Sequence, residues 1–505
     1  MNKINCIYPF SERVRELTIK FDKASSDKNT TELENLLDFA ESIIETEDAA
    51  SQAVIYYSMG TVLGDFPNLY NLSLDESTKK VLFYYRKSIK LIEGVDFTDE
   101  KLLPYVLAFK SGLYTNYGNA LDNCGRKVAS IEQYKKALSI DPHFGMAHGN
   151  LGKAYQHYGQ LEYDTLRRDY FHYFAYHHLQ MGVIDCNPNT YETAKKNFEL
   201  LISKYCDEYI EAVLKPDLQI PKKEYEDSDE LYYRIWCLRN GLFLNTLNDL
   251  PITELYFAND DIQLPDMIVD IGAKPVFHGI FGQLKQEYIY ARFMYFESLC
   301  VQSQPYYADR ETYIIACPDF SQYSIKLEKM KTAFKTLYGL FDKIAYFLAN
   351  YFDLGIKEKD INFRIIWQSS AGHGKNVYQF KNTLNPRSNF PLASLYWISN
   401  DFYFDNNNST SNPELKRIKD IRDSLEHKYV KICDFVSDEI SDGLALYVSE
   451  REMAQSTLTL LKILRESIIN LALCINIAEI PHRKDAKDKL VVKMRLMDYE
   501  DDWKI

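Results

Sequence analysis

Apolar residues recur at every third or fourth position over one long stretch, from residue 327 to residue 351. In a helix of 3.6 residues per turn, this spacing places them on one stripe, which has to be buried against other elements. The stripe consists of Leu327, Met330, Phe334, Leu337, Phe341, Ile344, Leu348 and Tyr351. The pattern therefore predicts a long helix that belongs to a helical bundle.

A second helix is predicted to begin after residue 412. Asn412 is a favourable N-cap, Pro413 suits the first helical position, and Glu414 suits the first turn. The apolar stripe of this helix is Leu415, Ile418, Ile421, Leu425, Tyr429 and Ile432. With a final helix expected at about residues 452–479, the region 321–505 is predicted to be a helical bundle with a basic tail.

Residues 1–180 are predicted to be one helix after another, with a repeat in the clearest part. Gly118 and Gly152, like Gly125 and Gly159, are separated by about 34 residues, which is the period of the tetratricopeptide repeat. That repeat also places an aromatic residue, a small residue and a terminating proline at the positions of Tyr134, Ala137 and Pro142. A looser copy begins near Tyr56. Residues 1–180 are therefore predicted to form a tetratricopeptide-like helical repeat domain.

The helical period weakens between residues 181 and 320. Short β-rich runs such as DMIVDIGAKPVF and ETYIIACPDF favour a mixed α/β linker domain there, although LYYRIWCLRNGLFLN also suits a helix. The predicted fold class is thus mainly α. It has N-terminal tetratricopeptide-like repeats, a mixed middle segment and a C-terminal helical bundle.

Composition narrows the functional classes. The net charge of −13 argues against a protein that binds nucleic acid over a generally basic surface, because phosphate binding depends on clustered Lys and Arg. Nine scattered cysteines without a CxxC pair indicate neither a disulfide framework nor a zinc site. No uncharged apolar run is long enough to span a bilayer, so we expect a cytoplasmic protein without membrane contact.

Two features resemble ligand sites without meeting the requirements of those sites. Six histidines between residues 143 and 178 lack the tight spacing of metal ligands, so we interpret them as polar positions on helices. The stretch SSAGHGKNV, residues 369–377, resembles the end of a phosphate-binding loop. It has Ser369 and Asn376 where that motif needs glycine and a hydroxyl residue, which favours a glycine-rich turn.

Positive charge gathers locally near the end of the chain, in residues 416–431 and 483–495. Within the first of these islands stand the candidate RNA-binding residues Lys416, Arg417, Lys419, Lys428 and Lys431.

The stretch IRDSLEHKYV, residues 421–430, lies inside the first island. On a helix, Arg422 lies at the edge of the buried stripe and His427 lies about 140° further round, facing outward. Arg422 with Glu426, and Asp423 with His427, would also make ordinary i, i+4 surface pairs. One straight helix cannot aim Arg422 and His427 at the same point without a bend or a second copy of itself.

A late helical bundle that carries RDSLEH resembles the HEPN superfamily, whose ribonucleases have an arginine, a polar residue, three further residues and a histidine. Arg422, Asp423 and His427 match these positions, and the repeats suggest the branch with N-terminal tetratricopeptide repeats. The resemblance implies RNA cleavage without a metal or other cofactor, at a site shared by two protomers of a homodimer. His427 would move protons, Arg422 would hold the scissile phosphate, and Asp423 would orient His427.

Two functions remain open from the sequence. The first is an endoribonuclease, a toxin-like or anti-phage defence effector regulated through its repeat domain, which would take a protein or peptide ligand. The second is a non-catalytic scaffold or sensor that uses the bundle for dimerisation or ligand binding. The Arg422, Asp423 and His427 trio favours the enzyme.

Overall fold

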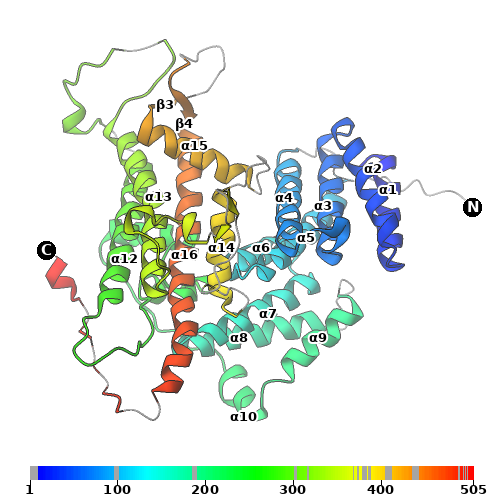
Figure 1. Cartoon of the computed structure of the whole chain (residues 1–505), viewed down its shortest axis with the longest axis horizontal. Helices are drawn as coiled ribbons and strands as arrows, with labels where there is room; N and C mark the ends of the chain where they lie inside the picture. Colours follow the sequence, from blue (N-terminus) through cyan, green and yellow to red (C-terminus); the bar gives the residue numbers. More distant parts are fainter. Residues whose placement is uncertain are drawn as a thin grey trace, which may run out of the picture.

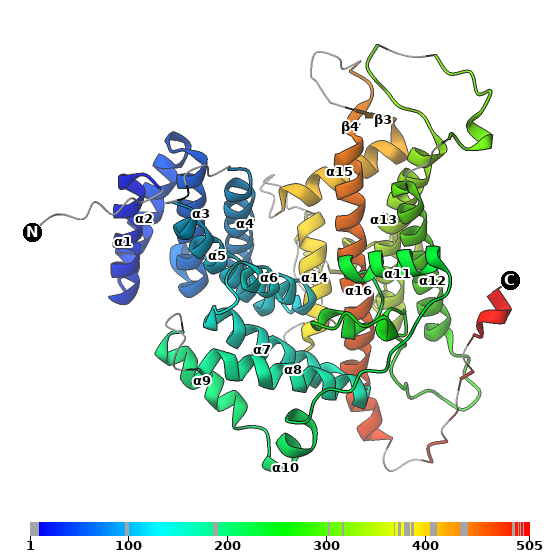
Figure 2. The same ribbon diagram turned by 180° about the vertical axis from the view of Figure 1, so that it is seen from behind.

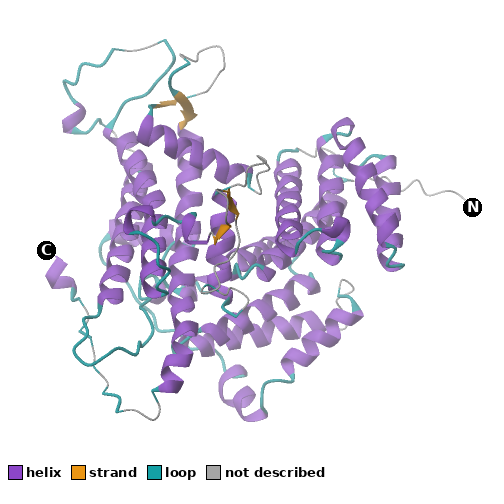
Figure 3. Ribbon diagram, in the orientation of Figure 1, coloured by secondary structure: helices purple, strands orange, loops and turns teal. Residues whose placement is uncertain are grey.

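The computed structural model is mainly helical, with a few short strands (Figure 3). It describes residues 10–95, 100, 102–184, 190–300, 304–315, 318–367, 369–371, 375–377, 384, 388–403, 412–434, 443–486, 490–492, 494, 496–497 and 499–504. In the described part of the chain, no helix is both long enough and apolar enough to cross a membrane.

The N-terminal region is an array of helices in which successive helices pack side by side (Figure 1). Within this region the pairs α3 with α4, α5 with α6, and α7 with α8 make the most extensive contacts. The helices are α1 Glu12–Ser26, α2 Thr30–Ile43, α3 Ala49–Asp65, α4 Leu74–Glu93, α5 Leu103–Asn123, α6 Lys127–Ile140, α7 Gly145–Leu161 and α8 Thr165–Val183. The predicted succession of helices in this part of the chain is confirmed.

The glycines of the repeat allow these helices to approach closely. A Cβ atom added to Gly118 on α5 would lie 2.6 Å from the Tyr134 ring on α6. A Cβ atom on Gly152 of α7 would lie 2.7 Å from the backbone nitrogen of Leu179 on α8. The repeat therefore reflects steric need at the contact between paired helices, where only glycine leaves enough room.

The middle segment also consists of helices and loops. It contains α9 Glu192–Ile202, α10 Asp207–Tyr209, the π-helix η3 Ile210–Leu214, α11 Ser228–Asn240, the 3₁₀ helices η4 Thr246–Asp249 and η5 Leu255–Phe257, and α12 Val276–Leu299. The helix considered for LYYRIWCLRN is therefore present, and it ends at Gly241, which adopts the left-handed conformation that favours glycine.

The strands expected in the middle segment do not form within its described residues, and this part of the prediction was wrong. Ile268, Val269 and Ile271 lie in an exposed loop, where the Ile268 N–H donates to the Glu479 carboxylate at 3.0 Å. The backbone thus finds a side-chain partner on another element. Since no described strand lies alongside, the β-propensity of the run has no ladder to join.

The C-terminal region is a bundle around one long helix, α16, which contacts α12, α13 and α14 (Figures 1 and 2). Its other helices include α13 Ile325–Tyr351, the 3₁₀ helices η7 Glu358–Asp360 and η8 Ile365–Trp367, α14 Phe390–Phe402 and α15 Pro413–His427. The α16 helix itself is Glu450–Asp485. The α13 stripe is buried as predicted, apart from Tyr351, which is partly exposed. The α16 helix covers the final helix predicted at about residues 452–479. It lies in the core, where its charged residues Arg465 and Glu466 are buried with partners.

The described strands form two small sheets. The strands β1 Ser369–Ala371 and β2 Lys375–Val377 pair antiparallel, and β3 Val430–Cys433 and β4 Leu446–Ser449 pair parallel. The expected glycine-rich turn at residues 372–374 lies outside the described residues.

Buried ion pairs join the N-terminal array of helices to the bundle. Both terminal nitrogens of Arg86 on α4 donate hydrogen bonds to the Asp401 carboxylate on α14, each with a nitrogen–oxygen distance of 2.7 Å. Arg126, just before α6, donates to Asp401 at 2.8 Å and to Glu466 on α16 at 2.7 Å. The side chains of these four residues are at most 10% exposed. The two regions therefore share a charged interior in addition to apolar contacts.

Candidate functional site

The helix α15 carries the candidate motif and contacts both α13 and α14 (Figure 2). It begins as the sequence predicts, because the Asn412 side chain accepts hydrogen bonds from the backbone nitrogens of Glu414 and Leu415 at 3.1 and 3.3 Å. Leu415, Ile418 and Ile421 are fully buried and anchor the helix. Its far end is consequently presented at the surface of the bundle.

The helix ends at His427, earlier than the predicted apolar stripe implied. Tyr429 is 46% exposed, and Ile432 is buried on the strand β3. The expectation that both residues continue the helical stripe was wrong. The reason is the parallel pairing of Val430–Cys433 with Leu446–Ser449. The backbone N–H and C=O groups of residues 430–433 bond to the neighbouring strand and not to a continued helix.

Arg422 is held against α13. Its guanidinium lies 5.0 Å from the centroid of the buried Tyr338 ring and donates to the Asp423 carboxylate at 3.0 Å. Burial lowers the pKa of Arg422, but the bond to Asp423 and the charge of nearby acidic groups outweigh burial and raise the pKa overall. Arg422 therefore stays positively charged, and its side chain is still 32% exposed.

Asp423 pairs with basic residues and not with His427. Its carboxylate contacts Arg422 at 3.0 Å and Lys419 at 3.8 Å. Among the described residues, no hydrogen bond or ion pair to His427 is present, and His427 is exposed at the last position of α15. The structure thus brings Arg422 and Asp423 together and leaves the His427 imidazole open to solvent.

The candidate RNA-binding residues fall into two groups. Lys416, Lys419 and Lys428 lie at least partly exposed on α15 or just after it. Arg417 donates to Glu452 on α16 at 2.6 Å and to the backbone oxygen of Tyr447 at 3.1 Å. Its charge is therefore largely used within the bundle.

Lys431 faces the interior and not the outward side that the predicted helix would give it. Its side chain is 7% exposed, and its ammonium group donates to the Asp319 carboxylate and lies 3.2 Å from the Tyr447 hydroxyl. The bond from Lys431 lowers the pKa of Asp319 well below its usual range. The difference arises because β3 buries all four of its side chains.

The second basic island is only partly described. Arg483 donates to the backbone oxygen of Asp266 at 2.9 Å and to the Asn476 amide at 3.0 Å, so it ties the end of α16 to the middle segment. Lys487, Lys489, Lys493 and Arg495 lie outside the described residues.

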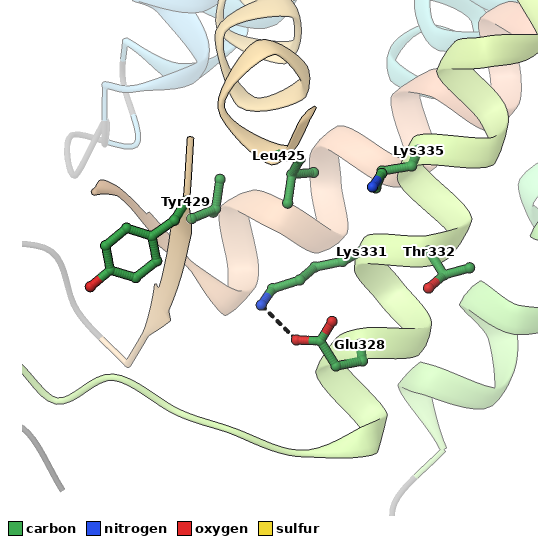
Figure 4. A pocket seen from close by; sticks show the side chains of 7 residues that line it. Glu328, Lys331, Thr332, Lys335, Leu425 and Tyr429 are labelled. Atoms are coloured by element: carbon green, nitrogen blue, oxygen red, sulfur yellow. Dashed lines mark hydrogen bonds and ion pairs between the residues drawn. The ribbon is translucent and has the colours of Figure 1, made fainter. Parts of the chain in front are cut away.

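A pocket of about 300 Å³ opens between α13 and the end of α15 (Figure 4). Its lining includes Glu328, Lys331, Thr332, Lys335, Leu425 and Tyr429. The sequence did not reveal it, because the charged face of α13 and the end of α15 are far apart along the chain and meet only when it folds. The one local signal was the alternation of apolar residues from Val430 onward, which favours a strand and so an exposed Tyr429.

Comparison with known families bears on this part of the chain. Residues 268–478 match the family described as LA2681-like HEPN. The matched segment contains α12 through most of α16, with Arg422, Asp423 and His427 inside it. The HEPN domain therefore begins within the segment that the sequence assigned to a linker, and it suggests a nuclease or a related role. No curated protein and no solved structure matches the chain.

Proposed function

We propose that this protein is a metal-independent HEPN endoribonuclease. The observation that carries the proposal is the placement of Arg422 and His427 on the accessible end of α15, within the matched HEPN domain. Both side chains reach solvent from a helix that is firmly anchored by its N-cap and its buried stripe.

The proposed reaction is an internal attack on the RNA backbone. The ribose 2′-oxygen bonds to the adjacent phosphorus, the bond from phosphorus to the 5′-oxygen breaks, and the products are a 2′,3′-cyclic phosphate and a 5′-hydroxyl. His427 has the side-chain type suited to take the 2′-hydroxyl proton or to protonate the leaving 5′-oxygen. Arg422, as a permanent cation, would stabilise the charge that develops on the phosphate.

A dimer would supply both groups to one phosphate. Within one chain, Arg422 leans toward α13 while His427 lies about 140° round the helix, so a second protomer is needed to complete the site. We propose a homodimer formed through the HEPN domain, in which Arg422 of one protomer works with His427 of the other. Asp423 then serves to hold Arg422, its observed partner, in place of its expected role toward His427.

The direct test is cleavage of single-stranded RNA by the purified full chain in EDTA, compared with the variants His427→Ala, Arg422→Ala and Arg422→Lys. Both alanine variants should lose activity by at least about a hundredfold, since general acid–base and electrostatic contributions are of that size. Wild-type activity that survives His427→Ala, or that disappears with the chelator, would contradict the proposal.

Mixing two inactive variants tests the shared site. A heterodimer of Arg422→Ala and His427→Ala chains keeps one site with both groups if the site is composite. Activity should therefore return when the two proteins are unfolded together and refolded. Failure to regain activity despite heterodimer formation, or a monomer by light scattering, would remove the composite site from the proposal.

The repeat region would regulate this activity. We propose that its helices are tetratricopeptide-like repeats that bind a protein or peptide, and that the whole chain acts as a toxin-like or anti-phage effector. Expression of the wild type should slow cell growth, and His427→Ala should relieve the effect. Equal growth inhibition by both, without RNA cleavage, would instead favour a non-catalytic scaffold or sensor that uses the HEPN domain for dimerisation.

A further inference from the structure

We infer that the pocket between α13 and the end of α15 binds one nucleotide of a single-stranded RNA substrate. The inference deepens the proposed ribonuclease function and rests on it. Leu425 and Tyr429 form part of the wall, and they stand two residues before and two residues after His427. The pocket therefore lies at the end of α15 that carries the candidate acid–base group, although His427 itself is not part of its lining.

The α13 side of the pocket supplies positive charge. Lys331 and Lys335 are four residues apart, so both point from one face of α13 toward the end of α15 (Figure 4). Lys331 pairs with Glu328 at 2.7 Å, and Lys335 reaches Glu426 at 3.7 Å. These pairs are at least partly exposed and contribute little stability, so a phosphate can take over either ammonium group at small cost.

The α15 side supplies an aromatic surface. Tyr429 is 46% exposed, and its backbone oxygen accepts a hydrogen bond from Leu446 at 3.0 Å, which fixes the residue at the rim. The Lys431 ammonium lies 5.4 Å from the centroid of its ring. An unpaired base can stack on such a ring, as bases do on aromatic side chains in proteins that bind single strands.

The size and lining of the pocket favour a nucleotide over other occupants. Its volume of about 300 Å³ lies at the small end of the range for ligand pockets. An apolar helix would gain nothing from the charged and polar side chains of Lys331, Thr332 and Lys335. A nucleotide offers an anion to the lysines and a flat ring to Tyr429.

The experiment measures binding of a 2′-O-methyl RNA oligonucleotide, which lacks the attacking hydroxyl and so stays intact. Fluorescence anisotropy with the full chain would compare the wild type with Tyr429→Ala, Tyr429→Phe and Lys335→Ala. Lys343→Ala is the matched control. Lys343 lies on the same helix, is 46% exposed against 43% for Lys335, and also has a glutamate partner.

Tyr429→Ala should weaken binding at least about fivefold, whereas Tyr429→Phe should preserve it because the ring remains. Lys335→Ala should lower the slope of log affinity against log salt by about 0.7, the value for one phosphate contact on a single strand. Lys343→Ala should change neither quantity. Wild-type affinity and salt slope in both Tyr429→Ala and Lys335→Ala would overturn the inference.

The two proposals fail in different ways. If His427→Ala abolishes cleavage while the pocket variants bind RNA normally, the ribonuclease proposal stands and the nucleotide site is refuted. If the wild type binds through Tyr429 and Lys335 but cleaves no RNA, the binding site stands and the catalytic proposal fails.

Discussion

Removing the Asp401 carboxylate should destabilise the contact between the N-terminal array of helices and the C-terminal bundle. Asp401 is 1% exposed and accepts two hydrogen bonds from Arg86 and one from Arg126. In Asp401→Ala, both guanidinium groups lose this partner. They cannot become neutral to escape burial, because arginine keeps its proton in proteins.

The expected loss is about 3–5 kcal/mol in the free energy of unfolding, the cost of leaving a buried charge without its partner. Arg126 retains its ion pair with Glu466 at 2.7 Å, whereas Arg86 loses its two bonds to Asp401 and retains the bond to the Tyr117 hydroxyl at 2.9 Å. The larger share of the loss is therefore expected at Arg86. Asp401→Asn keeps the shape and one acceptor oxygen, and it should cost less than alanine.

Urea titration with two probes can measure this loss and locate it. All four tryptophans lie at or after residue 236, so their fluorescence reports on the C-terminal part, whereas far-ultraviolet circular dichroism reports on every helix. Loosening at the joint should shift the dichroism transition to lower urea and separate the two transitions. Glu192→Ala is the control, since Glu192 and Lys196 form a pair at 3.7 Å with both side chains at least 70% exposed.

A loss below about 1 kcal/mol in Asp401→Ala, or one equal to that of Glu192→Ala, would refute the reasoning. Replacing Arg86 by leucine in the same chain should recover part of the loss, because an apolar side chain removes the buried charge whose carboxylate was deleted. If the double variant recovers no stability, the unpaired charge of Arg86 is not the cause of the loss.

Two further stability predictions concern the N-terminal array of helices. Burial raises the pKa of Glu162 to about 7, and Thr246 and Arg167 offset this only in part. The folded state thus favours the protonated form, and stability falls as pH rises from about 4.5 to 7. Glu162→Gln should therefore gain about 2–3 kcal/mol over wild type at pH 8 and almost nothing at pH 4.5; a pH-independent difference would contradict this. Gly152→Ala should cost about 1–3 kcal/mol in urea titration, because its Cβ would meet the α8 backbone at 2.7 Å, whereas Gly339→Ala, with open space around it, should be neutral or stabilising.

Local sequence determined where several helices begin and which face they bury. The apolar stripe of α13 and the Asn412 cap of α15 each depend on residues close together in sequence. Both features can therefore be predicted without knowledge of the elements that pack against these helices. The glycine period likewise indicated the closely packed pairs α5 with α6 and α7 with α8, because Gly118 and Gly152 each face the helix next in sequence.

Tertiary structure decided what those local patterns left open. The end of α15 at His427 depends on β4, a strand from a later part of the chain. By pairing with β3, β4 turns Lys431 inward onto Asp319. The contact between Arg86 and Asp401 joins positions 315 residues apart, and the pocket at the end of α15 lies between that helix and α13. Arg422, Asp423 and His427 could be selected from the sequence. Which of them pair, and which remains open to a partner, depends on elements that only folding brings together.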